Sequence, residues 1–234
     1  MVENQTGSRT ALVVGASRTI GLGLAAELVR RGWTVIATAR DAHPAELLQL
    51  AARSGGRLTV ERLDITDREQ TAGLRGRLAG TVLDLLYVSA GITDEDRPVG
   101  EVSTRVFVDV MVTNALSPMQ VVEDLASLVS PHGTIAVMSS RQGSIGFNTR
   151  GGHEVYRASK SALNQLMRSY AARTSGSART LLLTHPGWVQ TDLGGPGAQL
   201  SVEESTTGLI DTVERHAGDG GLQFLDYAGQ VVPW

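Results

Sequence analysis

The sequence predicts an α/β fold in which a doubly wound, mostly parallel sheet of about seven strands is covered by helices on both faces. Short apolar runs alternate with longer amphipathic segments over most of the 234 residues. Glycines stand at several of the junctions between them. Because no linker, repeat or low-complexity stretch interrupts this pattern, we expect a single domain at residues 10–234 that follows a flexible N-terminal tail at residues 1–9.

Each expected element follows from its residue pattern. The strands are short apolar runs at residues 11–14, 33–38, 57–62, 83–88, 134–138, 178–184 and 222–225. The helices are longer stretches at residues 20–31, 45–52, 66–78, 101–129, 156–174 and 201–216. In the first helix Ile20, Leu24 and Leu28 share one face. The stretch 101–129 predicts one long helix, with a bend expected at Pro118.

Composition excludes several classes of function. The chain has no cysteine, and its five histidines show no ligand spacing, so we expect no metal site. We expect His153 to be simply exposed, with a place in the substrate pocket as the alternative. We expect His185 to end a strand and His132 to lie in a surface loop. A net charge of −3 lacks the basic character of a nucleic-acid binder. No run approaches the roughly 18 apolar residues of a membrane span, and residues 1–9 have no apolar signal core. We therefore expect a cytoplasmic protein with no nucleic-acid or membrane partner.

A glycine-rich turn joins the first strand to the first helix. It reads Gly15-Ala16-Ser17-Arg18-Thr19-Ile20-Gly21. Such a turn aims free backbone N–H groups at an anion, which suits the pyrophosphate of a dinucleotide, although a turn of this kind can also be purely structural. We assign to the cofactor site the residues Gly15, Ser17, Arg18, Thr19, Ile20 and Gly21.

Charges near the end of the second strand indicate which dinucleotide is preferred. An acidic residue there accepts hydrogen bonds from the ribose 2′-hydroxyl, whereas arginines neutralise a 2′-phosphate. The residue that follows the expected strand is Ala39, which has no charge. Arg40 comes next, and Arg18 lies in the glycine turn. Asp41 favours NAD(H), but it comes two positions after Ala39. We therefore expect NADP(H) to be favoured over NAD(H).

Lys160 is the only lysine in the chain. In a helix, Tyr156 and Lys160 stand at i and i+4, so the phenol and the ammonium share one face. A cation beside a tyrosine favours the phenolate and lowers a pKa that starts at about 10. Tyr156 is thus a candidate acid–base group, although the pair alone leaves open a solvated lysine beside a half-buried tyrosine.

Two other polar residues belong with this pair. Asn114 is expected in the middle of a helix, which is unfavourable for asparagine unless its side chain has a role. Ser140 closes the fifth expected strand as the second residue of Ser139-Ser140.

These motifs together resemble the short-chain dehydrogenase/reductase family, which has a Rossmann-type fold. Gly15 and Gly21 match the first and last glycines of its turn, but Thr19 replaces the middle glycine and places a side chain near the expected path of the phosphates. Ser89-Ala90-Gly91 resembles the family's N-N-A-G motif, with serine in place of the second asparagine. The order Asn114, Ser140, then Tyr156-x-x-x-Lys160 matches the family's catalytic set.

The resemblance implies a role for each matched residue. Tyr156 would protonate the developing alkoxide, Ser140 would hydrogen-bond the same oxygen, and Lys160 would lower the tyrosine pKa and hold the nicotinamide ribose. Asn114 would hold a water that links to the lysine. The further cofactor contacts implied are Asp64, Ile65, Ser89, Ala90, Gly91, Tyr156, Lys160, Pro186, Gly187, Val189 and Thr191.

Residues 185–189, 221–227 and 232–234 resemble the C-factor-like and sniffer-like carbonyl reductase branch of the family. The resemblance implies an NADP(H)-dependent enzyme that interconverts a small-molecule carbonyl and an alcohol, assembled as a homodimer or homotetramer through helices 101–129 and 156–174. Two alternatives remain: an NAD(P)-binding signalling or sensing protein of C-factor type with little turnover, and a pathway enzyme for dehydration or epimerisation. The short loop at 193–201 implies an open site, and the sequence leaves the substrate undetermined.

Overall fold

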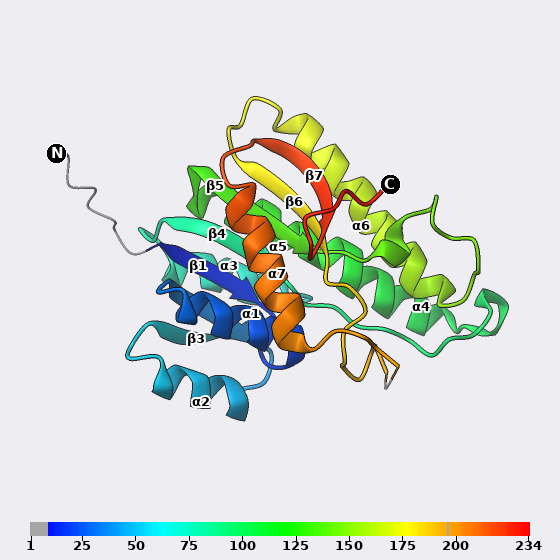
Figure 1. The fold of residues 1–234 in the computed structure, drawn as a ribbon, viewed down its shortest axis with the longest axis horizontal. Helices are drawn as coiled ribbons and strands as arrows, with labels where there is room; N and C mark the ends of the chain where they lie inside the picture. Colours follow the sequence, from blue (N-terminus) through cyan, green and yellow to red (C-terminus); the bar gives the residue numbers. More distant parts are fainter. Residues whose placement is uncertain (1–8, 196) are drawn as a thin grey trace.

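Seven parallel strands form one sheet in this computed structural model, which describes residues 9–195 and 197–234. The order across the sheet is β3-β2-β1-β4-β5-β6-β7 (Figure 1). The strands are β1 (Thr10–Val14), β2 (Thr34–Ala39), β3 (Leu58–Arg62), β4 (Leu83–Val88), β5 (Val129–Met138), β6 (Thr180–His185) and β7 (Gly221–Asp226). The predicted doubly wound sheet of seven strands is confirmed.

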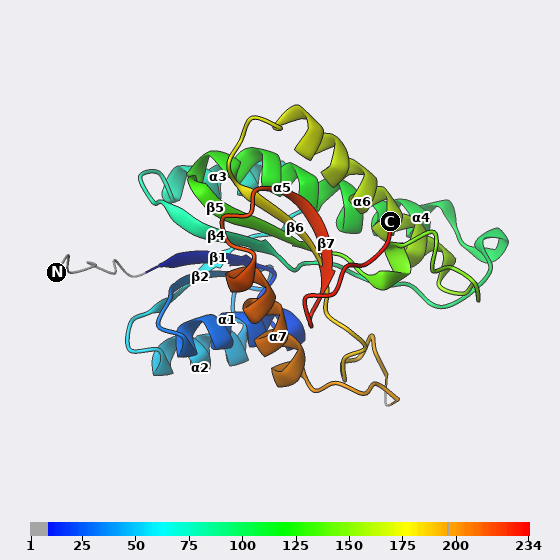
Figure 2. The same ribbon diagram turned by 45° about the horizontal axis from the view of Figure 1, so that its top comes forward.

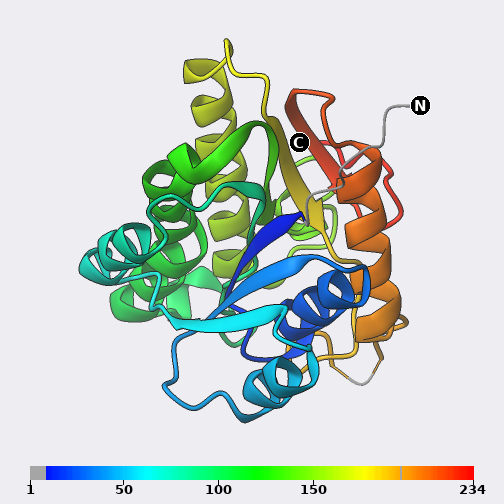
Figure 3. The same ribbon diagram turned by 90° about the vertical axis from the view of Figure 1, so that its left-hand side faces the viewer.

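Helices cover both faces of the sheet (Figures 2 and 3). One face carries α1 (Thr19–Arg30), α2 (Ala45–Arg53) and α7 (Val202–Arg215). The other carries α3 (Arg68–Arg77), α4 (Thr104–Met111), α5 (Ser117–Leu125) and α6 (Glu154–Arg173). Successive side chains of a strand point to opposite faces, so Leu12 packs in the core beneath α5 and α6 while Val13 packs in the core beneath α1 and α7. Burial on both faces explains why the strands are continuously apolar.

The order of the strands predicts a crevice at the carboxyl ends of the central strands β1 and β4. From β1 the chain passes to β2 and β3 in one direction, and then crosses back to place β4 on the other side of β1. The loops that leave the carboxyl ends of β1 and β4 therefore diverge, and ligands of doubly wound sheets bind at this switch point.

The predicted helix at 101–129 is wrong in its continuity. It is divided into α4, a wide π-helical turn at Val112–Leu116, and α5. Pro118, at the start of α5, has no N–H to donate to the carbonyl of Asn114, and its ring would clash with that carbonyl in a regular helix. The distortion therefore comes before the proline, around Asn114, rather than at the proline as predicted.

Several element boundaries also differ from the predictions. Helix α5 ends at Leu125, whereas the predicted helix continued to residue 129, and β5 already begins at Val129. The pairing of β5 with β4 shifts its register between Leu83 and Leu85. His132, expected in a loop, is an exposed residue of this strand. Helix α6 begins at Glu154, before the predicted start at 156. These boundaries depend on contacts between elements, which a local pattern does not record.

Part of the predicted N-terminal tail lies outside the described residues, which begin at Arg9. The Arg9 guanidinium lies 4.1 Å from the ring centroid of Trp33 and pairs with Glu214 at 2.7 Å. Glu214 also pairs with Arg31, which bonds Glu27 on α1 and Asp211 on α7. This network joins the C-terminal end of α1 to α7. Within the described ranges no helix is long and apolar enough to cross a membrane.

Candidate active site

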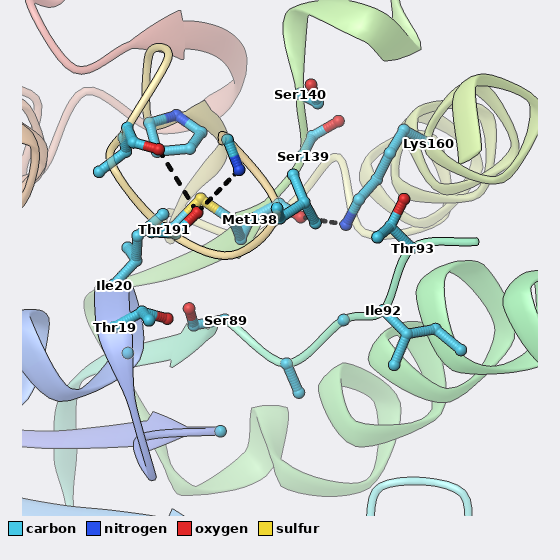
Figure 4. A pocket seen from close by; sticks show the side chains of 18 of the residues that line it. Thr19, Ile20, Ser89, Ile92, Thr93, Met138, Ser139, Ser140, Lys160 and Thr191 are labelled. Atoms are coloured by element: carbon cyan, nitrogen blue, oxygen red, sulfur yellow. Dashed lines mark hydrogen bonds between the residues drawn. The ribbon is translucent and has the colours of Figure 1, made fainter. Parts of the chain in front are cut away.

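A cleft of about 1580 Å³ opens at the carboxyl ends of the strands, across the switch point between β1 and β4. Every residue predicted for the site lines this cleft except Asn114, which is fully buried behind its wall. Figure 4 shows Thr19 and Ile20 on one side of the pocket and Ser140 and Lys160 on the other. The fold thus brings together residues that are up to 176 positions apart, from Gly15 to Thr191 (191 − 15).

The glycines of the first turn are required by its geometry. Gly15 has a φ of 86°, and a Cβ there would lie 2.7 Å from the Cβ of Ala90. A Cβ on Gly21 would lie 2.0 Å from the carbonyl oxygen of Gly15. No side chain caps the first turn of α1, so its backbone N–H groups remain available to an anion. These features fit the pyrophosphate of a dinucleotide.

Thr19 occupies a backbone conformation that suits glycine. Its φ is 45°, in the left-handed region, where a β-branched residue is strained. The family motif has its middle glycine at this position, and glycine adopts the left-handed conformation without strain. Threonine adopts it here at a cost of about 1–2 kcal/mol. The exposed Thr19 side chain also lines the cleft, as predicted.

Two arginines face the end of the cleft where β2 finishes. Arg18 and Arg40 are exposed and line the cleft, and within the described ranges neither guanidinium group forms an ion pair or hydrogen bond with another residue. Asp41, beside them, accepts a hydrogen bond from the N–H of His43 at 3.2 Å. Two unpaired guanidinium groups are free to bind an anionic group.

The turns after β3 and β4 form the adjacent wall of the cleft. Asp64 accepts hydrogen bonds from the N–H and the hydroxyl of Thr66 at 2.9 and 2.7 Å. It does not cap α3, since Asp67 has that role. After β4, the N–H groups of Ser89 and Ala90 both donate to the carbonyl of Val14, at 2.9 and 3.2 Å. These bonds hold the segment beside β1, and Ile65 and Gly91 line the same wall.

Asn114 connects the loop after β4 to α6. Its Oδ1 accepts from the N–H of Ile92, and its Nδ2 donates to the carbonyl of Ile92, both at 2.8 Å. Nδ2 also donates to Ser159 Oγ at 3.0 Å, and that hydroxyl donates to the carbonyl of Tyr156 at 2.7 Å. The side chain therefore has the role that its mid-helix position predicted, as a bridge to the helix that carries Tyr156. Its link through a water to Lys160 stays a prediction.

Lys160 is buried, and its ammonium donates to the carbonyl of Met138 at 2.9 Å. Burial lowers the pKa of Lys160 to about 8. The Nζ atom lies 5.8 Å from the centroid of the Tyr156 ring. Desolvation by the surrounding protein raises the pKa of Tyr156 to about 12, and a hydrogen bond with Ser140 opposes this rise. The predicted lowering of the Tyr156 pKa by Lys160 is therefore wrong for the protein groups alone, because desolvation dominates.

Ser140 begins a tight turn at the end of β5. Its Oγ accepts from the N–H of Gln142 at 3.1 Å, and its carbonyl accepts from the N–H of Gly143 at 2.8 Å. The serine hydroxyl and the tyrosine phenol thus reach the cleft from different elements, one from the end of β5 and one from α6.

The segment after β6 is held from two sides. The Ser205 hydroxyl on α7 donates to the carbonyl of Pro186 at 2.7 Å. Gly187 has a φ of 84°, and a Cβ there would lie 2.4 Å from a Leu200 methyl group. Val189 is buried and forms a β-bridge with Leu200. Thr191 Oγ1 accepts from the N–H of Gly194 at 3.0 Å, which closes the turn at 191–194.

The mouth of the cleft contains two apolar residues that the sequence did not indicate. Phe147 and Leu193 are exposed and line the cleft beside Trp188 of the segment 185–189. No local pattern marks Phe147 and Leu193, because they lie in loops. His153 also lines the cleft, which was the alternative to simple exposure. His185 ends β6 as predicted, and burial lowers its pKa to about 4, so it is neutral near pH 7.

The described residues contain no group of three or more His, Asp or Glu side chains arranged to hold a metal ion. The cleft brings together a glycine turn at a helix N-terminus, a buried lysine, a tyrosine and a serine. Together they define a dinucleotide-dependent oxidoreductase site.

Comparison with known proteins gives the same class. The family model described as short chain dehydrogenase matches residues 9–199. The chain belongs to this family, and it is an oxidoreductase of the nicotinamide-dependent kind.

Several relatives are similar over most of the chain. A solved Burkholderia multivorans protein, named as a putative short-chain dehydrogenase/reductase with bound NADP, is 50% identical, with a TM-score of 0.95, and covers 97% of this chain and 100% of its own. A carbonyl reductase from Pseudomonas aeruginosa PAO1 in complex with NADP is 38% identical, with a TM-score of 0.90 and the same coverage. C-signal of Myxococcus xanthus is 34% identical over 154 residues, which cover 65% of this chain and 93% of that protein.

We predict that Thr19→Gly raises the free energy of unfolding by about 1 kcal/mol, because relief of left-handed strain outweighs the extra chain entropy of glycine. Thr19→Ala keeps the strain and serves as the control. Chemical denaturation at pH 7 measures both. A glycine variant less stable than the wild type would contradict the strained conformation of Thr19.

Proposed function

We propose that this enzyme interconverts a small-molecule carbonyl compound and its alcohol with NADP(H) as the preferred cofactor. The observation that carries the proposal is the meeting of Ser140, Tyr156 and Lys160 in the same cleft as the glycine turn. The NADP complex of the carbonyl reductase from Pseudomonas aeruginosa supports the same chemistry.

The protein supplies the proton for this reaction, and a bound nicotinamide supplies the hydride. Tyr156 donates its phenolic proton to the carbonyl oxygen as that oxygen gains negative charge, and Ser140 donates a hydrogen bond to the same oxygen. With a pKa raised to about 12, Tyr156 is protonated at pH 7, as a proton donor must be. Lys160 contributes a compact charge that serves the phenol and a ribose hydroxyl, and Asn114 holds α6 against the loop after β4.

The preference for NADP(H) is supported by the two unpaired arginines. Arg18 and Arg40 stand at the end of the cleft nearest β2, where a ribose 2′-phosphate would lie in a doubly wound fold. No acidic side chain follows β2 directly, because Ala39 is its last residue. The remaining cofactor contacts that we propose lie in the turns after β1, β3, β4 and β6, and they are the residues that the sequence predicted there.

The similarity to C-signal favours one alternative, a signalling protein that binds the nucleotide with little turnover. The intact set of Asn114, Ser140, Tyr156 and Lys160 supports turnover instead, because a sensor that only binds a nucleotide needs no proton donor. No feature of the cleft favours dehydration or epimerisation.

We predict that Tyr156→Phe lowers turnover by about 10³-fold, because it removes the proton donor, and leaves the Kd for NADPH within about twofold. Oxidation of NADPH with a panel of aldehydes, ketones and quinones measures the first quantity, and fluorescence titration measures the second. Tyr170→Phe, on the same helix but in the core, is the matched control and should keep full activity. Turnover near that of the wild type in Tyr156→Phe would sink the assignment. NADPH binding with no turnover by the wild type across the panel would favour the sensor.

We predict that the double substitution Arg18→Ala and Arg40→Ala weakens NADPH binding about 100-fold and leaves NADH binding nearly unchanged, because only NADPH carries the 2′-phosphate. Arg141→Ala, which removes a different cleft-lining arginine, should not alter the ratio of the two Kd values. Equal weakening of both cofactors would show that these arginines do not read the 2′-phosphate.

We also propose that the chain pairs as a homodimer or homotetramer through α4, α5 and α6. Support comes from exposed apolar side chains, namely Phe107 and Val108 on α4, Leu116 in the π-helical turn before α5, and Leu166 on α6. We predict that sedimentation equilibrium finds a dimer or tetramer and that Leu166→Glu weakens it, whereas Leu48→Glu on α2 does not. A wild-type monomer at micromolar concentration would contradict the pairing.

A further inference from the structure

Asn164 is a buried polar residue on α6 that the chemistry described above does not use. It lies one helical turn after Lys160. Its Oδ1 accepts from the hydroxyl of Ser139 at 2.6 Å, and its Nδ2 donates to the carbonyl of Gly143 at 3.2 Å. One side-chain amide therefore bonds to both ends of the segment that contains Ser140.

The turn held in this way is closed and tightly packed. Ser140 accepts from the N–H groups of Gln142 and Gly143, so residues 140–143 form one hydrogen-bonded unit. Ser161 on α6 also donates to the carbonyl of Gly143, at 3.0 Å. A Cβ on Gly143 would lie 2.8 Å from the Cβ of Lys160. The turn therefore has little freedom to move relative to α6 while these contacts persist.

We propose that Asn164 is a positioning residue that sets the Ser140 hydroxyl against Tyr156 by holding the Ser140 turn to α6. The two hydroxyls come from different elements, and an error of an ångström between them is enough to impair catalysis. This inference rests on the proposed function, in which Ser140 and Tyr156 act on one oxygen.

The chemistry of an amide suits this place. Ser139 presents a hydroxyl proton and Gly143 presents a carbonyl oxygen, so the connecting group needs one acceptor and one donor. An ionised aspartate would offer acceptors only, and leucine, of similar shape, would offer neither. Both polar atoms of Asn164 are satisfied, as a buried amide requires. The two hydrogen bonds, to Ser139 and to Gly143, thus explain why asparagine and not an apolar residue is buried at this position.

The test compares Asn164→Leu in two backgrounds, the wild type and Ser140→Ala. In the wild type we expect kcat for carbonyl reduction to fall about 10- to 100-fold, with the Kd for NADPH changed less than twofold. In Ser140→Ala the same substitution should leave kcat nearly unchanged, because the hydroxyl that Asn164 positions is already absent. A similar loss of kcat in both backgrounds would overturn the proposal.

The pH profile supplies a readout that loss of stability does not mimic. Ser140 lowers the pKa of Tyr156 against the effect of burial, so a displaced Ser140 lets that pKa rise. Reduction needs the protonated phenol, and activity falls as pH rises through its pKa. We therefore expect the descending limb of kcat to move to higher pH in Asn164→Leu, in the same direction as in Ser140→Ala. An unmoved limb in Asn164→Leu with a moved limb in Ser140→Ala would count against the proposal.

Two further variants keep the test decisive. Ser139→Ala removes one of the two bonds, and we expect a smaller loss of kcat, about three- to tenfold, that also disappears in the Ser140→Ala background. It replaces Asn164→Leu should that variant fail to fold. Thr71→Val, which removes a buried hydroxyl on α3, is the stability control and should lower Tm without lowering kcat. Full activity of Ser140→Ala would instead refute the proposed role of Ser140 in the reaction. Failure of the proposed function can thus be distinguished from failure of the proposed role of Asn164.

Discussion

The buried ammonium of Lys160 constrains the rest of the cleft. Taking a charge out of water costs several kcal/mol unless polar partners compensate, and here the carbonyl of Met138 at the end of β5 provides one. The stem of the lysine lies against Gly143, where a Cβ would lie 2.8 Å from the Cβ of Lys160. Gly143 thus leaves room for the lysine and allows α6 to approach the turn after β5 closely. The compact ammonium of lysine can be aimed at one carbonyl, whereas the guanidinium of arginine is a planar fork.

Local preference and global need conflict at several positions around this centre. Thr19 adopts a left-handed conformation, Asn114 sits in a widened helical turn, and Tyr156 has a raised pKa because the protein encloses it. Elsewhere, strands and helices follow their residue patterns closely. Departures from local rules that gather around one cleft are typical of functional sites, where surrounding packing maintains conformations that a free segment would avoid.

The relatives and the contacts within this chain indicate the same kind of site. Similarity to NADP-bound relatives identifies the class of reaction, whereas the contacts of this chain show how its own residues would carry it out. The network of Arg31 with Glu27, Asp211 and Glu214 joins the C-terminal end of α1 to α7. Asn114 joins α6 to the loop after β4, and Asn164 joins it to the turn after β5. The helix that carries Tyr156 and Lys160 is thus held beside the cleft by two buried side-chain amides.

The sequence by itself determined the fold class and a set of site residues, all of which except Asn114 line the cleft. Alternating apolar and amphipathic segments predict strands and helices through local periodicity, and the glycine turn and Tyr156-x-x-x-Lys160 are short motifs whose spacing has a direct geometric meaning. Only the tertiary structure decided the position of the helix break before Pro118, the direction of the Tyr156 pKa and the partners of Asn164. These depend on contacts such as Ser139 to Asn164, which are 25 positions apart, and on the burial that surrounds them. No local pattern carries that information, because desolvation and long-range hydrogen bonds arise only when the elements pack.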